Sequence, residues 1–402
     1  MKKRFLSAGL AVVMAASLTA CGGSGSASTT TAAAGEAKAE GESKAAESSA
    51  AADGASFKIG GIGPVTGGAA VYGLAVQHGA EIAVKEINEA GGINGYPVEF
   101  QFQDDEHDAE KSVNAYNTLK DWGMQALMGT VTSAPCIAVA DKTAADNMFQ
   151  ITPSGSAVEC AANPNVYRVC YSDPAQGTAS AKYIGEHKLA SKVAVIYDSS
   201  DVYSSGIYEK FAQEAPNQGI EVVDAEAFTA DSNKDFSTQL QKAKESGAEL
   251  VFLPIYYTEA SLILQQANTM GFAPQFFGCD GMDGILQVQN FDVKLAEGLM
   301  LLTPFAADAT DDLTVKFVKS FEDAYGETPI QFAADAYDAM YVIKAAMEEA
   351  NVTPDMAVGD ICDAMEGAMT KIKVDGLTGT NMTWTEDGEP EKDPKAVQVV
   401  DG

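Results

Sequence analysis

The sequence predicts an α/β fold of two doubly wound parallel-sheet lobes, joined by a hinge that the chain crosses several times. From Phe57 onward, short β-like runs alternate with helical windows, which is typical of a parallel sheet covered by helices on both faces. The same alternation starts again at Lys192. About 345 residues follow Ala55, enough for two domains of ordinary size.

The first run of elements lies between residues 57 and 152. Strands are predicted from β-like or alternating apolar patterns at 57–62, 98–102, 126–128 and 149–152. Apolar residues at helical spacing predict a helix around Ala80 to Ile87 that stops at Gly91 and Gly92. Further helices are predicted over 109–122 and from about 134.

The second run begins with the strand "KVAVIY" at 192–197. Further strands are predicted at 220–228, 250–255 and 276–277, with helices between them at 204–217, 235–246 and 259–270. Beyond residues 298–303, helical windows follow at 313–324, 333–349 and 356–369, and "GLTGTNMTW" then has strand character. These helices are too many for the second sheet alone, so some are expected to return to the first lobe.

We expect lobe I to comprise residues 56–173 and 304–383, and lobe II residues 174–303 and 384–402. Ligands of two-lobed α/β proteins commonly bind between the lobes. In parallel sheets they bind at the carboxyl ends of the strands.

The amino terminus has the three parts of a secretory signal peptide over residues 1–20: Lys2 to Arg4, an apolar core, and the closing "LTA" before Cys21. "LTAC" resembles a bacterial lipoprotein signal, in which the cysteine is lipidated and becomes the new amino terminus. Residues 21–55 lack aromatic residues, leucine, isoleucine and valine, so a flexible tether is expected. The folded part would then be held at the extracytoplasmic face of a bacterial membrane.

The formal net charge is −31, and removing residues 1–20 would take away three positive charges and no negative ones. No basic patch stands out, which argues against nucleic acid as a partner. No phosphate-binding G-x-x-x-x-G-K-[ST] motif occurs, and "GGIGPVTGG" has Thr66 where a dinucleotide loop needs its third glycine. The chain is therefore expected not to be an enzyme and to carry no cofactor.

The three histidines, His78, His107 and His187, form no H-E-x-x-H motif and accompany no paired cysteine ligands, so no metal site is predicted. We interpret them as surface or satisfied histidines. Cys160 and Cys170 are the only close pair of cysteines; a disulfide and two reduced buried thiols are both open. The remaining cysteines after Cys21 are interpreted as small core residues: Cys136, Cys279 and Cys362.

Several segments resemble solute-binding proteins of ABC transporters, specifically the type I periplasmic binding fold and its branched-chain amino acid subfamily. The most specific is "INEAGGINGYPVEF" (87–100). "GPVTGGAAVYG" (63–73), "DWGMQALMGTVTSAP", "ITPSGSA", "KVAVIYDSSDVYSSG" and "FFGCDG" (276–281) support it. The resemblance implies a monomer that captures a small amino acid, branched-chain or otherwise aliphatic, and delivers it to a permease.

In this family, hydroxyls and backbone N–H groups at strand ends hold the α-carboxylate of the ligand, and an acidic side chain of the other lobe holds its α-ammonium. Carried over by motif, the resemblance implies a carboxylate group of Ser133, Ser154 and Ser156, an ammonium partner at Asp280, and a cleft lined by Tyr72, Tyr203 and Tyr256. Tyr257 is an alternative to Tyr256, and the serines and Asp280 are also ordinary turn residues. Two alternatives stay open: a different small ligand, such as an amide, an aromatic acid or a nucleoside, and a ligand sensor that feeds a signalling partner.

Overall fold

The protein is described by a computed structural model that covers residues 54–392 and 395–401. The predicted signal peptide, the lipid attachment at Cys21 and all but the end of the tether lie outside the described residues. Within the part of the chain that the structure describes, no helix has the length and apolarity to cross a membrane.

The first lobe is built on a five-stranded parallel sheet with strand order β2-β1-β3-β4-β5. Its strands are β1 (Phe57–Gly63), β2 (Val98–Asp104), β3 (Ala126–Gly129), β4 (Phe149–Thr152) and β5 (Val166–Arg168). The connecting helices are α1 (Ala70–Glu89), α2 (Ala109–Trp122) and α3 (Ser133–Asp146). Successive strand residues face opposite layers: Met128 joins the core cluster that contains α1, whereas Leu127 joins the cluster beneath α2 and α3. Burial on both faces explains the apolar run of the central strand β3, whereas the edge strand β2 alternates between buried and exposed residues.

The second lobe has a six-stranded sheet of order β13-β10-β9-β8-β6-β7, in which only β13 runs antiparallel to its neighbour. Its strands are β6 (Lys192–Asp198), β7 (Glu221–Phe228), β8 (Leu250–Leu253), β9 (Gln275–Gly278), β10 (Met300–Leu302) and β13 (Ala396–Gln398). Its helices are α4 (Asp173–Glu186), α5 (Val202–Glu214), α6 (Ser237–Glu245) and α7 (Tyr257–Thr269). The predicted fold class is therefore confirmed.

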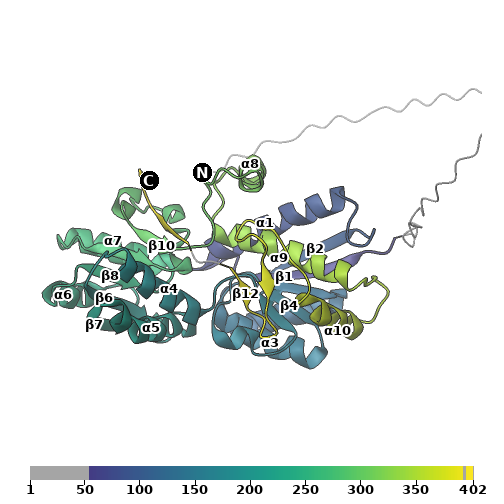
Figure 1. Cartoon of the computed structure of the whole chain (residues 1–402), viewed down its shortest axis with the longest axis horizontal. Helices are drawn as coiled ribbons and strands as arrows, with labels where there is room; N and C mark the ends of the chain where they lie inside the picture. Colours follow the sequence, from purple (N-terminus) through teal and green to yellow (C-terminus); the bar gives the residue numbers. More distant parts are fainter. Residues whose placement is uncertain (1–53, 393–394, 402) are drawn as a thin grey trace, which may run out of the picture. The chain divides into compact units, whose positions relative to one another are not determined.

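Three helices that follow β10 pack on the first lobe, in line with the expectation that some would return there: α8 (Asp312–Tyr325), α9 (Gln331–Glu349) and α10 (Val358–Met369). Helix α9 lies against α1 (Figure 1), and a Cβ on Gly79 would come within 2.1 Å of the carbonyl oxygen of Ala333, so this approach requires glycine. The short strands β11 (Thr383–Trp384) and β12 (Pro390–Glu391) pair with each other. The chain passes between the two sheets after β5, after β10 and again before β13.

The sequence patterns missed β5 and α4. Strand β5 has only three residues, and α4 begins with "DPAQG", which reads as a turn. Gly177 does not break the helix. It allows α4 to pack closely on α5, because a Cβ at Gly177 would lie 2.5 Å from the carbonyl oxygen of Ile207 in α5. The omission matters because α4 carries two polar side chains next to Asp280.

Candidate functional site

Six of the seven residues implied by the motifs line one pocket at the carboxyl ends of the strands. In the closed arrangement its own side chains nearly fill the pocket: the cavity volume is only about 10 Å³, roughly the space of one water, so the lobes must part to admit a ligand. Its lining residues are Tyr72, Val131, Thr132, Ser133, Ser154, Tyr203, Tyr256, Asp280, Gly281 and Phe332.

One end of the pocket is formed by the start of α3, where unpaired backbone N–H groups and the helix dipole favour an anion. Ser133 is the first residue of α3, and its hydroxyl accepts hydrogen bonds from the backbone N–H groups of Ser156 (3.2 Å) and Ala157 (3.1 Å). Its own proton remains available for a ligand. The hydroxyl of Ser154 instead donates to the carbonyl of Val131 at 2.6 Å, so it has only acceptor capacity left.

Ser156 does not line the pocket; it lies directly behind it. Its side chain is 1% exposed and its hydroxyl has no hydrogen-bond partner. The segment around it is fixed by the buried guanidinium of Arg168, which donates to the carbonyls of Ser156 (2.6 Å) and Ala157 (3.0 Å) and forms an ion pair with Glu389 at 3.2 Å. Arg168 thus fixes the position of the loop that follows β4 relative to Ser133.

The opposite end of the pocket is acidic. Asp280 is 5% exposed; its Oδ1 accepts hydrogen bonds from the Tyr203 hydroxyl (2.7 Å) and the Gly281 N–H (2.7 Å), and its Oδ2 accepts one from Gln176 Nε2 (2.8 Å). Burial raises the pKa of Asp280 to about 6, against the effect of these three donors, so the group is mostly ionised at neutral pH.

A second carboxylate, Asp173, stands close to Asp280. It is 2% exposed, one of its oxygens has no partner, and burial raises its pKa well above the usual range, with the charge of Asp280 acting in the same direction. None of the described residues that line the pocket is a lysine or arginine. A buried carboxylate without a cation is unfavourable, so this end of the pocket suits a positively charged group.

Aromatic rings form the walls between the two ends. Tyr203 and Tyr256 stack with centroids 4.9 Å apart, and Tyr72 stacks on Phe332 at 4.2 Å. Of the two adjacent candidates, Tyr256 lines the pocket, whereas the Tyr257 hydroxyl accepts a hydrogen bond from the N–H of Val71 at 3.3 Å. The walls therefore offer apolar surface to a ligand.

Direct hydrogen bonds join the two lobes around the pocket. The Tyr72 hydroxyl donates to the carbonyl of Gly281 and accepts the N–H of Tyr257 at 3.2 Å. The N–H of Gln331, at the start of α9, donates to Asp283 at 2.7 Å. The lobes are thus closed on each other, and a ligand can enter only if they move apart.

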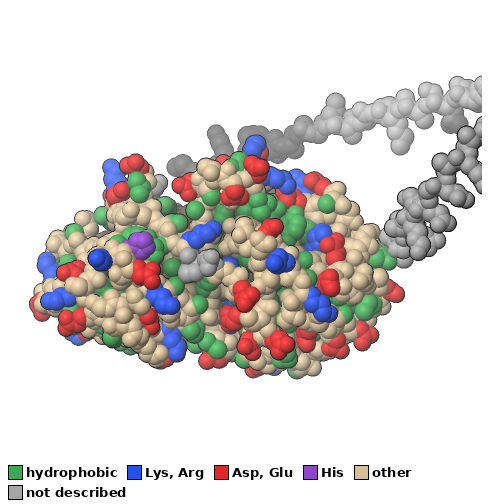
Figure 2. Space-filling model, viewed as in Figure 1, with side chains coloured by type: hydrophobic (Ala, Val, Ile, Leu, Met, Phe, Trp, Pro, Cys, Tyr) green, Lys and Arg blue, Asp and Glu red, His purple; other side chains and the backbone are tan. Residues whose placement is uncertain are grey.

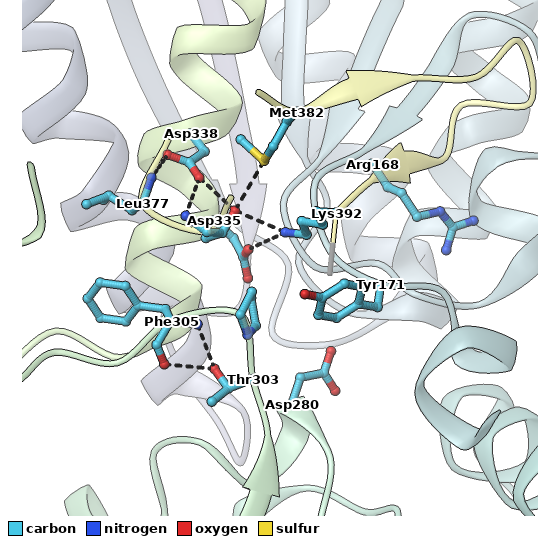
Figure 3. A network of polar contacts seen from close by, with 12 residues as sticks. Arg168, Tyr171, Asp280, Thr303, Phe305, Asp335, Asp338, Leu377, Met382 and Lys392 are labelled. Atoms are coloured by element: carbon cyan, nitrogen blue, oxygen red, sulfur yellow. Dashed lines mark hydrogen bonds and ion pairs between the residues drawn. The ribbon is translucent and has the colours of Figure 1, made fainter. Parts of the chain in front are cut away.

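A buried charge cluster lies where the third chain crossing leaves the first lobe. Lys392 follows β12, with its side chain 1% exposed; its ammonium lies 3.8 Å from Asp335, donates to the Thr378 hydroxyl at 3.0 Å and sits 5.0 Å from the ring centroid of Tyr171 on the first crossing. Figure 3 shows Lys392 between Asp335 and Tyr171, with Asp280 nearby. Both oxygens of Asp335 are buried without a hydrogen bond, so Lys392 is their principal stabilising charge.

Sequence reasoning missed four polar residues at or beside the pocket. Asp173 and Gln176 belong to the unassigned helix α4, and Thr132 directly precedes Ser133 in a motif already singled out. His107 was interpreted as a surface or satisfied histidine; its ring contacts Thr132 and Tyr256. The signal that could have found Thr132 was its place in the short loop between the end of β3 and the start of α3.

The described cysteines are all free and buried. Of the two possibilities left open for Cys160 and Cys170, the structure therefore shows two reduced buried thiols and no disulfide between them. Cys136, Cys279 and Cys362 are core residues as predicted. Across residues 54–392 and 395–401, no group of histidine, cysteine and acidic side chains is arranged to hold a metal ion. On the face drawn in Figure 2, basic side chains are scattered among acidic ones.

Comparison with known proteins identifies this architecture. The profile of the family described as periplasmic binding protein matches residues 56–402, so the chain belongs to that family, and its fold is the type I periplasmic binding fold. The chain is 32% identical to the Leu/Ile/Val-binding protein homolog 3 of Brucella melitensis over 305 residues, which cover 75% of this chain and 82% of the relative.

Two further relatives bear on the pocket. The leucine-, isoleucine-, valine-, threonine-, and alanine-binding protein of Pseudomonas aeruginosa is 30% identical over 297 residues, covering 73% of this chain and 79% of that protein. A branched-chain amino acid transporter substrate binding protein, LivJ of Streptococcus pneumoniae, was solved in complex with isoleucine. It superimposes with a TM-score of 0.78 and 26% identity, covering 86% of this chain and 96% of that one.

Proposed function

We propose that the protein captures a free α-amino acid with a small, branched-chain or otherwise aliphatic side chain and delivers it to the permease of an ABC transporter. The observation that carries this proposal is the polarity of the pocket: a hydroxyl and helix-start end at Ser133 faces an acidic end at Asp280, with aromatic walls between them. An α-amino acid presents a carboxylate, an ammonium and a side chain in the same arrangement.

The chemistry of each end supports this assignment. The free Ser133 proton and the N–H groups at the start of α3 suit a carboxylate, and charge-assisted hydrogen bonds of this kind are about twice as strong as neutral ones. Three hydrogen-bond donors fix the orientation of the Asp280 carboxylate in the absence of a ligand, so it is already positioned to pair with an ammonium. The relatives named above bind leucine, isoleucine and valine, according to their names.

The role follows from closure and involves no chemical conversion of the ligand. Because Ser133 belongs to the first lobe and Asp280 to the second, an amino acid that contacts both stabilises the closed arrangement. The permease and its ATPase subunits would recognise this closed form. We infer a binding protein that is not an enzyme.

The remaining parts of the chain fit the same proposal. We propose that residues 1–20 are removed, that Cys21 carries the lipid, and that residues 21–55 tether a monomer to the extracytoplasmic face of the membrane. We further propose that both lobes are discontinuous and close about the crossings. The bounds expected from the sequence, 56–173 with 304–383 and 174–303 with 384–402, need one shift, because Trp384 and Gly388 bond to Arg168 and Lys392 pairs with Asp335, so residues 384–392 pack on lobe I.

The test is a thermal-shift screen of the full chain, purified in mild detergent and washed in dilute denaturant to remove any bound ligand. The twenty amino acids are compared with small carboxylates and amides, since a ligand of the folded state raises its melting temperature. A response to leucine, isoleucine, valine or another free amino acid is expected. A response only to ligands that lack an ammonium would overturn the amino acid proposal, and a permease pull-down that recovers a signalling protein would favour a sensing role.

A further inference from the structure

Two cysteine thiols lie together behind the carboxylate end of the pocket. Cys136 belongs to the first turn of α3, and Cys160 belongs to the 3-10 turn η1 (Val158–Ala161), which packs on that helix. Both side chains are 0% exposed, and together with Ala157 they form a small apolar cluster. The Cys160 thiol also donates to the carbonyl of Ser133 at 3.6 Å, so the pair contacts a residue that lines the pocket.

The surroundings make the two thiols chemically unequal. The sulfur of Cys136 accepts a hydrogen bond from Nε2 of Gln150 at 3.6 Å. Hydrogen bonding with the Cys160 thiol lowers the pKa of Cys136 despite its burial, and the charge of Arg168 acts in the same direction. Burial raises the pKa of Cys160. Because the thiolate is the nucleophile in thiol–disulfide exchange, Cys136 is suited to attack a disulfide, and Cys160 to resolve the mixed disulfide that results.

The cover over this pair of thiols is thin, and part of it comes from the other lobe. Val158, the first residue of η1, is 54% exposed, so the cluster lies close to the surface. Two partly buried side chains pack against the cluster, Ile137 of α3 and Val202 of α5. Because α5 belongs to the second lobe, Val202 leaves the cluster when the lobes part. The thiols are therefore better shielded in the closed form than in the open form.

We propose that Cys136 and Cys160 are a redox-active dithiol, which forms a disulfide by exchange with a small disulfide when the lobes are open. In the first step, the Cys136 thiolate attacks one sulfur of the small disulfide, forms a mixed disulfide and releases one thiolate. The Cys160 thiol then loses its proton, and its sulfur attacks the sulfur of Cys136 and releases the second thiolate. The two released thiolates take up the protons lost by the two cysteines. The protein dithiol is thus oxidised, and the small disulfide is reduced to two thiols.

The new bond acts on the pocket through Ser133. It ties η1 to the first turn of α3 and removes the proton that Cys160 donates to the Ser133 carbonyl. The N–H groups of Ser156 and Ala157, which donate to the Ser133 hydroxyl, lie on the segment that leads directly into η1. Oxidation should therefore weaken the binding of a carboxylate. This consequence rests on the proposed amino acid-binding function, whereas the formation of the disulfide does not.

Oxidation of the stripped full chain with oxidised glutathione tests the proposal, followed by alkylation of the remaining thiols and mass spectrometry of the peptides. We expect a disulfide between Cys136 and Cys160, while the other described thiols stay reduced. Cys160→Ser should stop the reaction at a mixed disulfide on Cys136, and Cys136→Ser should leave Cys160 reduced over the same time. Cys362→Ser is the matched control, because that thiol is buried in α10 outside the cluster, and the yield of the disulfide should not change. Urea unfolding of each variant checks that it is folded.

The same reaction with saturating isoleucine tests the shielding by Val202. Isoleucine should slow the formation of the disulfide several-fold, and calorimetry should show that the oxidised chain binds isoleucine about 3- to 10-fold more weakly than the reduced chain, the effect of one disturbed hydrogen bond. A chain whose Cys136 and Cys160 stay unlinked unless it is unfolded in urea would overturn the inference. An equal rate with and without isoleucine, in a chain that binds it, would overturn the shielding. If no amino acid bound in the thermal-shift screen, the proposed function would fail, while the peptide masses would still decide whether the dithiol exists.

Discussion

Replacing Asp280 by asparagine should have opposite effects on ligand binding and on the stability of the unliganded protein. The substitution keeps the size of the side chain and removes its charge. An ammonium paired with a buried carboxylate loses about 2–4 kcal/mol when its partner is truncated, which corresponds to roughly 30- to 1,000-fold in Kd. The unliganded protein should become more stable, because the carboxylate is buried without a cation.

The size of the stability gain follows from the pKa of Asp280. A folded-state value of about 6 against an ordinary value of 3.8 means that ionisation opposes folding by about 3 kcal/mol at neutral pH. The gain in Asp280→Asn has this value as its upper limit, since the Tyr203, Gly281 and Gln176 donors lose a charged acceptor. Calorimetry gives the Kd, and urea unfolding gives the free energy of unfolding.

Asp283→Asn is the matched control for this experiment. Burial raises the pKa of Asp283 to about 6 as well, but its carboxylate accepts the N–H groups of Gln331 and Gly284 and does not line the pocket. It should change binding far less than Asp280→Asn. Unchanged affinity in Asp280→Asn, or a loss of stability in the unliganded protein larger than that of the control, would refute the reasoning.

Three further predictions concern pH, the carboxylate end and the crossing. Because the folded-state pKa of Asp280 is raised, protonation of Asp280 favours folding but removes the partner of the ligand's ammonium. Calorimetry should therefore show an affinity about tenfold weaker at pH 5 than at pH 7. Urea unfolding should show that the free energy by which ionised Asp280 opposes folding disappears as pH falls from 6 towards 4. Ser133→Ala removes the free hydroxyl proton and two acceptor contacts, so titration should give a Kd about 5- to 50-fold higher. Lys392→Met leaves the buried Asp335 carboxylate without its cation, and urea unfolding should show a free energy of unfolding lower by about 3–5 kcal/mol. Adding Asp335→Leu to the same chain should largely restore the stability.

The fold could be predicted from the sequence largely because its central strands, such as β3, β4 and β8, are buried on both faces. Phe149–Thr152 and Ala109–Trp122 were delimited correctly, since both are bounded by turn chemistry and have a clear apolar period. Helix α4 was not predicted, because the glycine that allows it to approach α5 also reads as a helix breaker. Tertiary packing, which no local pattern records, decided the conformation there.

The sequence predicted those residues of the candidate site that lie just after the ends of strands. Asp280 lies two residues after β9, and Ser133 begins the helix after β3, so parallel topology brings each to the carboxyl edge of its own sheet. His107 contacts Thr132 and Tyr256 only because two residues adopt positive φ in a loop from another strand. The place of Asp173 beside Asp280 depends on helix α4, which was not predicted. Neither the contacts of His107 nor the approach of Asp173 to Asp280 has a signal in sequence spacing.

The unsatisfied groups around the pocket explain how ligand binding and lobe closure are coupled. In the closed arrangement, the Tyr256 hydroxyl and one oxygen of Asp173 are buried without partners, and Asp280 is buried without a cation. Each of these makes the empty closed form less favourable by about 1–3 kcal/mol, because the same groups are hydrated when the lobes are apart. All three groups lie on elements of the second lobe, so the ammonium and side chain of an amino acid relieve these penalties while its carboxylate meets Ser133 of the first lobe. A ligand that contacted Ser133 alone would leave the penalties in place and would shift the equilibrium little.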